Sequence, residues 1–196
     1  MARTGRRPGN QDTREAILNA ARQAFAERGF DGASIRQIAT SAGVDPALVH
    51  HYFGAKDRLF LATMDAPFDP GEVLPQVFDP GLDGVGERLV RMFVSVWDSP
   101  AGTPVVALVR SAMQHDWSAR MLREFLVSQI LRRATRALNL DPAEAPIRTS
   151  LVASQLIGLA MLRYILKLEP LASMPPEEVV RYIAPTIQRY LADPLP

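Results

Sequence analysis

Two short helices joined by a tight turn are the feature that most restricts how this chain can fold. Ser34 and Gln37 have the spacing of a capping box, and Gly43 follows as a helix stop. Asp45 and Pro46 start the second helix, because Asp caps a helix and Pro at the first helical position gives up only an unpaired amide. Helices this short are marginal alone in water, so both must pack on neighbours. The order helix, turn, helix predicts a helix-turn-helix unit.

The rest of the chain predicts further helices. Ile17, Ala21 and Phe25 recur at helical spacing until Gly29, and no long stretch alternates apolar and polar residues as a strand would. The predicted helices cover residues 13–28, 35–42, 46–53, 55–65, 84–97, 104–115, 117–139, 147–168 and 176–192. The sequence therefore predicts an all-α fold.

Residues 66–83 are rich in proline and glycine and contain no Lys or Arg, which predicts a connector between two domains. We expect a helix-turn-helix DNA-binding domain at 1–65, with a basic arm at 1–11, and a helical effector-binding and dimerisation domain at 84–196. Charge agrees with this division. The formal net charge of +1 conceals a basic excess in residues 1–60 and a slightly acidic remainder.

Several kinds of chemistry are excluded or disfavoured. The chain has no cysteine, which excludes disulfides, thiolate metal sites and cysteine nucleophiles. None of the histidine, serine or glycine spacings typical of metalloproteases, hydrolases or phosphate loops occurs. We expect no enzyme, no cofactor and no metal site. The basic N-terminus lacks the apolar core of a signal peptide, so we expect a cytoplasmic protein.

The last two predicted helices have more apolar surface than a small domain easily covers. Residues 149–162 carry no charge, but this stretch is shorter than the roughly 20 residues of a membrane span and predicts a buried helix. Val179, Val180, Ile183 and Ile187 form an apolar stripe on 176–192. We expect a homodimer through 147–168 and 176–192, and no membrane association.

The second helix of the helix-turn-helix unit suits the major groove of DNA. Val44, Val49 and Phe53 can point inward, which leaves small and hydrogen-bonding side chains outside. Each group of candidates has an alternative explanation. The histidines could lie on an exposed helix face without a role, and Lys56 could be an ordinary solvated lysine. Arg3, Arg6 and Arg7 could form a solubilising tail. The candidate DNA-binding residues are Arg3, Arg6, Arg7, Ser34, Arg36, Asp45, Pro46, Ala47, Leu48, His50, His51, Tyr52 and Lys56.

The runs at residues 13–30, 32–44 and 51–60 resemble the N-terminal domain of the TetR-type transcriptional repressors. The order His50-His51-Tyr52-Phe53 differs from the Tyr-Tyr-His-Phe-like string common in that family, so which ring reads bases stays open. The resemblance implies a homodimer that places two recognition helices on a near-palindromic double-stranded DNA operator. It also implies an effector pocket in the second domain.

We expect a small apolar effector, because large apolar groups with few polar ones fill the predicted second domain. Ordinary core packing is the alternative for each candidate, and Gln155 could equally serve a dimer contact. A protein that binds ligand and dimerises without binding DNA is the alternative function. The candidate effector-binding residues are Met92, Phe93, Trp97, Met113, Trp117, Phe125, Gln155 and Tyr164.

Overall fold

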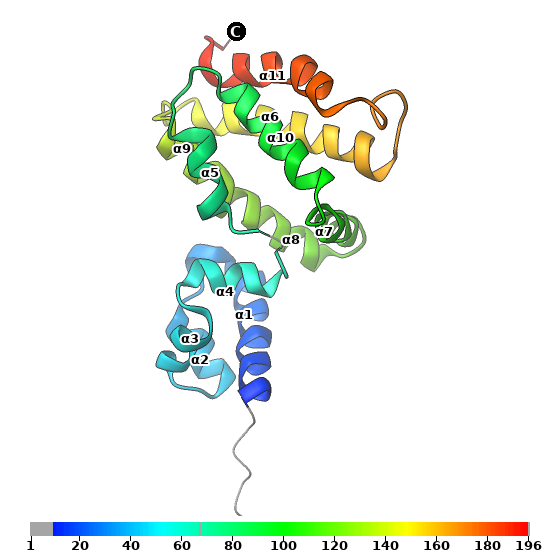
Figure 1. The fold of residues 1–196 in the computed structure, drawn as a ribbon. Coiled ribbons are helices and arrows are strands. Elements are labelled where there is room, and N and C mark those ends of the chain that lie inside the picture. The colour runs from blue at the N-terminus through cyan, green and yellow to red at the C-terminus, as the bar shows by residue number, and fades with distance from the viewer. Residues whose placement is uncertain (1–9, 67, 196) are drawn as a thin grey trace, which may run out of the picture.

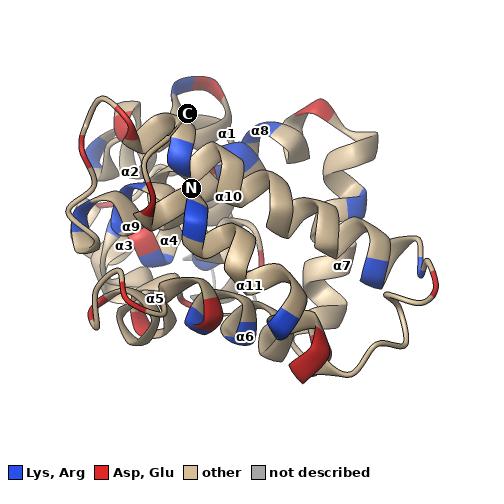
Figure 2. Ribbon diagram, turned by 90° about the horizontal axis from the view of Figure 1, so that it is seen from above, with Lys and Arg blue, Asp and Glu red and all other residues tan. Residues whose placement is uncertain are grey.

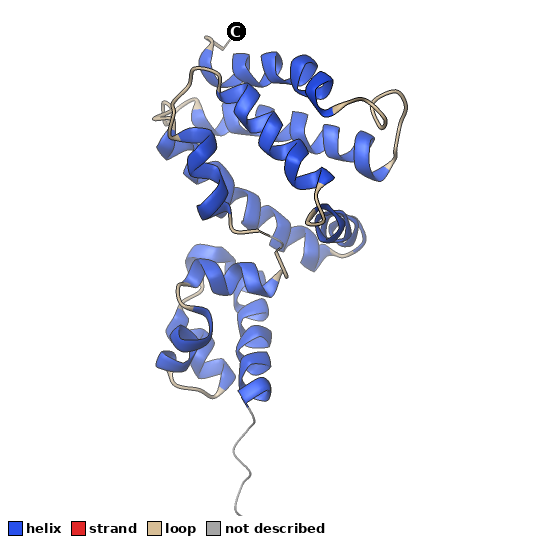
Figure 3. Ribbon diagram, in the orientation of Figure 1, coloured by secondary structure: helices blue, strands red, loops and turns tan. Residues whose placement is uncertain are grey.

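The computed structural model describes residues 10–66 and 68–195, and every regular element in that part of the chain is a helix (Figure 3). No strand occurs among the described residues. The predicted all-α fold is therefore confirmed.

The N-terminal helices form a compact bundle at one end of the molecule (Figure 1). The first helix is longer than predicted, but its backbone leaves helical geometry at Gly29, where φ is 68° and ψ is 177°. The predicted stop at this glycine thus appears as a break within one longer element. The bundle consists of α1 (Asn10–Gly32), α2 (Ile35–Ala42), α3 (Pro46–Phe53) and α4 (Lys56–Thr63).

Aromatic packing holds the bundle together. Phe25 and Phe60 are fully buried, and their rings meet edge to face with centroids 5.0 Å apart. Phe30, from the turn beyond Gly29, packs on both rings at 6.0 and 5.3 Å. Such contacts stabilise a core beyond the area they bury. The short helices α2 and α3 therefore gain from this core the stability that they lack alone.

The predicted connector contains a helix, α5 (Pro70–Phe78), that the sequence analysis did not anticipate. Asp69 caps it by accepting a hydrogen bond from the backbone N–H of Gly71 at 2.7 Å, and Pro70 occupies the first turn. Leu74, Val77 and Phe78 are buried. Burial of this apolar face outweighs the backbone hydrogen bond that Pro75 cannot donate.

The remaining helices form the second, larger body (Figure 1). Two predicted helices, 117–139 and 147–168, each contain a π-helical segment that their periodicity did not reveal. The elements are α6 (Val85–Asp98), α7 (Gly102–Gln114), α8 (Asp116–Phe125), η1 (Leu126–Leu131), α9 (Arg132–Ala137), α10 (Ala145–Ala160), η2 (Met161–Ile165) and α11 (Pro176–Ala192).

Helices α6 and α11 lie side by side and approach closely at Gly86 (Figure 1). A Cβ atom at this glycine would lie 2.5 Å from the carbonyl oxygen of Ala184 and 2.7 Å from the backbone nitrogen of Gln188. The Gln188 side chain accepts a hydrogen bond from the Gly86 N–H at 2.8 Å and donates one to the Leu82 carbonyl at 2.8 Å. The apolar stripe of α11 is thus used mainly against α6.

The stretch Ala145–Ile165 is long and apolar enough to cross a bilayer by length and composition alone, a test that core helices of soluble proteins also pass. Arginines near both of its ends are buried. Arg148 donates to the carbonyl groups of Tyr190 and Asp193, each at 2.8 Å. Arg163 donates to two carbonyl groups of the following loop, each at 2.7 Å. This stretch is therefore anchored at both ends by contacts within the fold.

We expect Gly86→Ala to lower the free energy of unfolding by about 1–3 kcal/mol, because the added methyl group forces two backbones apart. Thermal unfolding followed by circular dichroism measures the effect. Ser95→Ala, at an exposed position of the same helix, should leave stability nearly unchanged. Equal midpoints for both variants would show that α6 and α11 do not approach as described.

Candidate nucleic-acid interface and apolar cavity

Local caps set the geometry of α2 and α3. The capping box at the start of α2 is complete: Ser34 Oγ accepts from the Gln37 N–H at 3.3 Å, and Gln37 Oε1 accepts from the Ser34 N–H at 3.1 Å. Gly43 closes the helix in the left-handed conformation, with φ at 69°. Asp45 Oδ1 accepts from the Ala47 N–H at 2.7 Å and caps α3. The points at which the two helices begin and end therefore follow from their own sequence.

Helix α3 has one buried and one exposed face, as predicted. Val49 is fully buried and Phe53 is 7% exposed, so both anchor the helix to the bundle. The exposed positions are Ala47, Leu48, His50 and His51. A helix that is anchored on one side and displays small and hydrogen-bonding residues on the other can enter a major groove.

The two histidines differ in their surroundings. His50 Nδ1 lies 2.9 Å from the carbonyl oxygen of Gly54. A carbonyl oxygen can only accept, so Nδ1 carries the proton, and Nε2 is the acceptor of the neutral ring. His51 packs against Tyr52 at an angle of 70°, with ring centroids 5.4 Å apart. One ring nitrogen of His50 is thus already hydrogen-bonded within the protein.

The flanking candidates border this helix. Ser34 and Arg36 are exposed at the start of α2, and Tyr52 is half-buried. The Lys56 ammonium lies 4.5 Å from the centroid of the Phe30 ring, a cation–π contact that orients a partly exposed cation at the start of α4. Pro46, which opens α3, is partly buried. The predicted arm residues Arg3, Arg6 and Arg7 lie outside the described residues.

An apolar cavity of about 220 Å³ lies inside the second body. Helices α5, α6, α7, α8, η1, α9, α10 and α11 all contribute to its wall. The wall consists of Ala66, Phe68, Leu74, Phe78, Leu89, Met92, Phe93, Val96, Trp97, Val105, Leu108, Val109, Leu122, Phe125, Leu126, Ile130, Leu131, Ala134, Thr149, Val152, Ala153, Leu156, Ile157, Ala160 and Leu191.

The structure brings half of the predicted effector residues to this wall, namely Met92, Phe93, Trp97 and Phe125. The others are outside it. Met113 and Trp117 lie at the surface, 55% and 38% exposed. Gln155 is half-buried on α10, and Tyr164 stacks on Trp97 with centroids 5.0 Å apart. Burial raises the pKa of Tyr164 to about 12.

The sequence analysis missed the cavity residues of α5 and α10. Leu74 and Phe78 belong to a helix that was not predicted, although Asp69-Pro70 before them is a helix-start signal. Val152 and Leu156 belong to a predicted helix whose apolar residues run nearly all round, so spacing alone could not select those that face a cavity.

The cavity wall has almost no polar chemistry. Its one hydroxyl, on Thr149, donates to the Ala145 carbonyl at 2.7 Å and is therefore satisfied within its own helix. No charged residue is among those that line the cavity. A site of this kind excludes ions, because nothing in it compensates the loss of their hydration.

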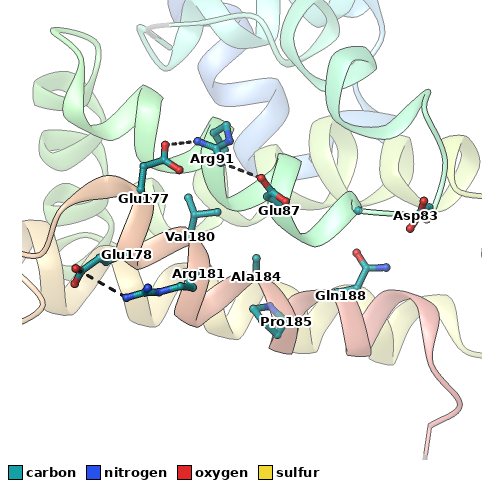
Figure 4. Close-up of a pocket in the computed structure, with 11 residues that line it drawn as sticks. Asp83, Glu87, Arg91, Glu177, Glu178, Val180, Arg181, Ala184, Pro185 and Gln188 are labelled. Carbon is teal, nitrogen blue, oxygen red and sulfur yellow. Dashed lines mark hydrogen bonds and ion pairs between the residues drawn. The ribbon is translucent and has the colours of Figure 1, made fainter.

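A shallower hollow lies outside, between α6 and α11 (Figure 4). Arg91 bridges Glu87, at 2.9 Å, and Glu177 across it, and these carboxylates raise the pKa of Arg91 above its ordinary value. The same contact lowers the pKa of Glu177. Figure 2 shows charges of both signs on these helices. This mutual pairing makes the hollow a poorer candidate for ligand binding than the cavity.

A capped two-helix unit with an exposed second helix, next to a helical body with an apolar cavity, is typical of one class of protein, the helix-turn-helix regulators of transcription. Residues 17–63 match the family model for bacterial regulatory proteins of the tetR family, and residues 83–191 match the tetracyclin repressor-like C-terminal domain. The chain belongs to the TetR family. Regulators of this family bind DNA and small-molecule effectors and act as dimers.

Individual relatives of the chain are also transcriptional regulators. The chain is 51% identical over 51 residues to the HTH-type transcriptional regulator BetI of Brucella anthropi, a match that spans 26% of each protein. It is 42% identical over 79 residues to the transcriptional repressor AcnR of Corynebacterium efficiens, 40% of each. The matched regions thus span less than half the length of these curated relatives.

Solved structures cover nearly the whole chain. A TetR-family regulator from Streptomyces coelicolor A3 is 43% identical, over 96% of this chain and 99% of that one, with a TM-score of 0.49. The multidrug binding protein EbrR in complex with proflavin is 18% identical, over 91% of this chain and 99% of that one, with a TM-score of 0.50.

Proposed function

We propose that this TetR-family chain is a repressor that binds a near-palindromic DNA operator as a homodimer and is released by a small apolar effector. The single observation that carries the proposal is the exposed face of α3, displayed by a helix whose opposite face is anchored in the bundle core. Membership of a family of transcriptional regulators favours this function over ligand binding without DNA.

The DNA contacts divide into base readout and backbone positioning. Ala47, His50 and His51 face outward on α3 and are suited to base edges, and the contact of His50 Nδ1 with the Gly54 carbonyl leaves Nε2 for such an edge. Ser34 and Lys56 are placed at helix starts beside it, where phosphate contacts would set the register. Asp45, Pro46 and Leu48 shape the start of α3, and the remaining candidates are Arg3, Arg6, Arg7, Arg36 and Tyr52.

Dimerisation would cover the outer side of α10 and the segment after it. Ile147, on α10, is 49% exposed, and Leu162, Leu166 and Leu168, in the segment after α10, are 37%, 63% and 55% exposed. Apolar side chains gathered in this way mark an interaction surface. A second copy suits it, because two identical faces related by a two-fold axis also place two α3 helices for two half-sites.

The effector would occupy the apolar cavity. About 220 Å³ suits a compact molecule of one or two rings, and the uncharged wall selects an uncharged one. The proposal includes no enzymatic step, cofactor or metal. We place the protein in the cytoplasm, where its operator would be accessible.

We expect His50→Ala to weaken operator binding by about 5- to 100-fold, because it removes a hydrogen-bonding group from the face of α3 that reads bases. The operator comes from selection of binding sites out of random DNA, and fluorescence anisotropy gives the affinities. His115→Ala is the matched control, since His115 is exposed between α7 and α8. An unchanged affinity, or a large drop in melting temperature, would remove His50 from the recognition face.

We expect Lys56→Ala to weaken binding by a similar factor for all operator variants and to reduce the slope of log K against log salt by about one. The reason is the loss of one phosphate contact that carries no sequence information. Arg110→Ala removes an exposed positive charge from α7, in the second body, and should leave the slope as it is. Equal slopes for the two variants would exclude Lys56 from the phosphate contacts.

We expect the wild-type chain, with a subunit mass of 21.6 kDa, to be a dimer by light scattering at micromolar concentration. Leu162→Glu should shift it toward monomer, because a carboxylate would be buried against the second copy. Val127→Glu, at an apolar residue of similar exposure on η1, is the control. A monomeric wild type would contradict both the interface and the model of two half-sites.

A further inference from the structure

The continuous helix formed by α8, η1 and α9 belongs to both bodies of the molecule. Met121 and Phe125, from α8, are buried in the core of the N-terminal bundle. Ile130 packs against both cores, and Ala134 is buried in the core of the second body. Figure 1 shows α8 lying across the junction, above α1. A displacement of this helix therefore acts on both cores at once.

The same helix forms one side of the apolar cavity. Leu122, Phe125, Leu126 and Ile130 line it. Because Phe125 contributes to the bundle core and to the cavity wall together, an occupant of the cavity presses directly on a side chain that supports α1.

Glu124, beside Phe125, makes a polar contact with α1. Its Oε2 accepts a hydrogen bond from the backbone N–H of Phe30 at 2.8 Å. The contact depends on Gly29: its φ of 68° disfavours other residues, and a Cβ atom there would lie 3.0 Å from the same oxygen. The carboxylate thus caps the break in α1, next to the ring on which Lys56 rests.

Two arginines extend this contact. Arg132 pairs with Asp31 at 2.6 Å, and Arg133 Nη2 donates to Asp57 at the start of α4 at 2.9 Å. Gln129, 1% exposed, accepts from the same nitrogen at 3.2 Å and orients it. Ion pairs this exposed add little to the stability of the fold, but these two connect the α8–η1–α9 helix to α1 and to α4.

The π-helical segment η1 lies between Glu124 and the two arginines. A π turn holds one residue more than an α turn, so its conversion to α geometry would rotate one flank against the other by about 100°. The geometry of η1 thus sets where Glu124 lies against α1 relative to where Arg133 lies against α4. Side chains of η1 also line the cavity.

We propose that Glu124, with Arg132 and Arg133, is the positioning contact through which cavity occupancy changes operator affinity. The proposal rests on the proposed function and names the residues that transmit its regulation. An apolar occupant displaces Phe125 and Leu126, the helix moves Glu124 and Arg133 relative to α1 and α4, and α3 shifts with them. Glu124, Arg132 and Arg133 do not line the cavity and are not among the candidate DNA-binding residues, so we assign them a positioning role.

The test measures operator affinity with and without saturating 1-naphthylamine, a neutral fluorescent probe of two fused rings that fits the size of the cavity. Binding in the cavity is read by energy transfer from Trp97 in a Trp117→Phe background, where Trp97 is the only tryptophan. We expect the probe to weaken operator binding of the otherwise unmodified chain by 5- to 100-fold, and the operator to weaken probe binding by the same factor.

In Glu124→Ala combined with Arg133→Met, we expect this factor to fall below about threefold, while probe affinity stays within about twofold of the parent. Glu124→Gln alone keeps an oxygen that can accept from the Phe30 N–H, so the probe should still weaken its operator binding by most of the parent's factor. Arg123→Gln, an exposed neighbour on α8, is the control and should keep it fully. An undiminished factor in the double variant overturns the proposal, as does a probe that fails to bind or binds without effect.

Failure of the proposed function would appear differently, as a parent chain that binds no DNA at all. The contact is then tested by amide hydrogen exchange at Phe30. Exchange that changes when the probe binds supports transmission through Glu124, and exchange that does not change overturns it.

Discussion

The burial of Met121 and Phe125 among the N-terminal helices is the contact on which the rest of the structure depends. It makes a helix of the second body part of the core of the first. Leu108, Leu122 and Leu126 pack against the same core beside them, and exposed ion pairs add to the junction. Because protein interiors are close-packed, a helix shared by two cores cannot shift without both responding. The core of the N-terminal bundle and the wall of the apolar cavity are therefore joined through one helix.

Local hydrogen bonds and long-range packing determine different features of the N-terminal bundle. Ser34, Gly43 and Asp45 set where α2 and α3 begin and end, through hydrogen bonds that span only a few residues. Val49 and Phe53 then decide which side of α3 is exposed, because they insert into a core built by α1 and α4. The exposed side is thus a consequence of apolar anchoring, and its small and hydrogen-bonding residues make it suitable for a groove of DNA.

The second body was less predictable from sequence. Its helices were placed to within a few residues, but α5 was missed because four prolines and the glycines of residues 66–83 concealed a capped apolar turn. The spacing rules applied to the sequence do not predict the two π-helical segments. Trp97 and Trp117 had equal claims as effector residues, yet one lines the cavity and the other is exposed. Periodicity identifies the apolar side of a helix, but it does not say whether that side faces a core, a cavity or a second copy.

The sequence by itself determined the all-helical fold, the helix-turn-helix unit and its caps, because these depend on interactions among residues a few positions apart. The tertiary structure alone decided where the cavity lies and how Glu124 meets Phe30, a partner 94 residues away. Contacts of that separation arise from how whole helices pack, and neither residue carries a local signal of the other. The helix-turn-helix unit could thus be predicted from one short stretch of sequence. The helix at 117–139 was also predicted, but only the folded structure shows that it packs against both the N-terminal bundle and the cavity.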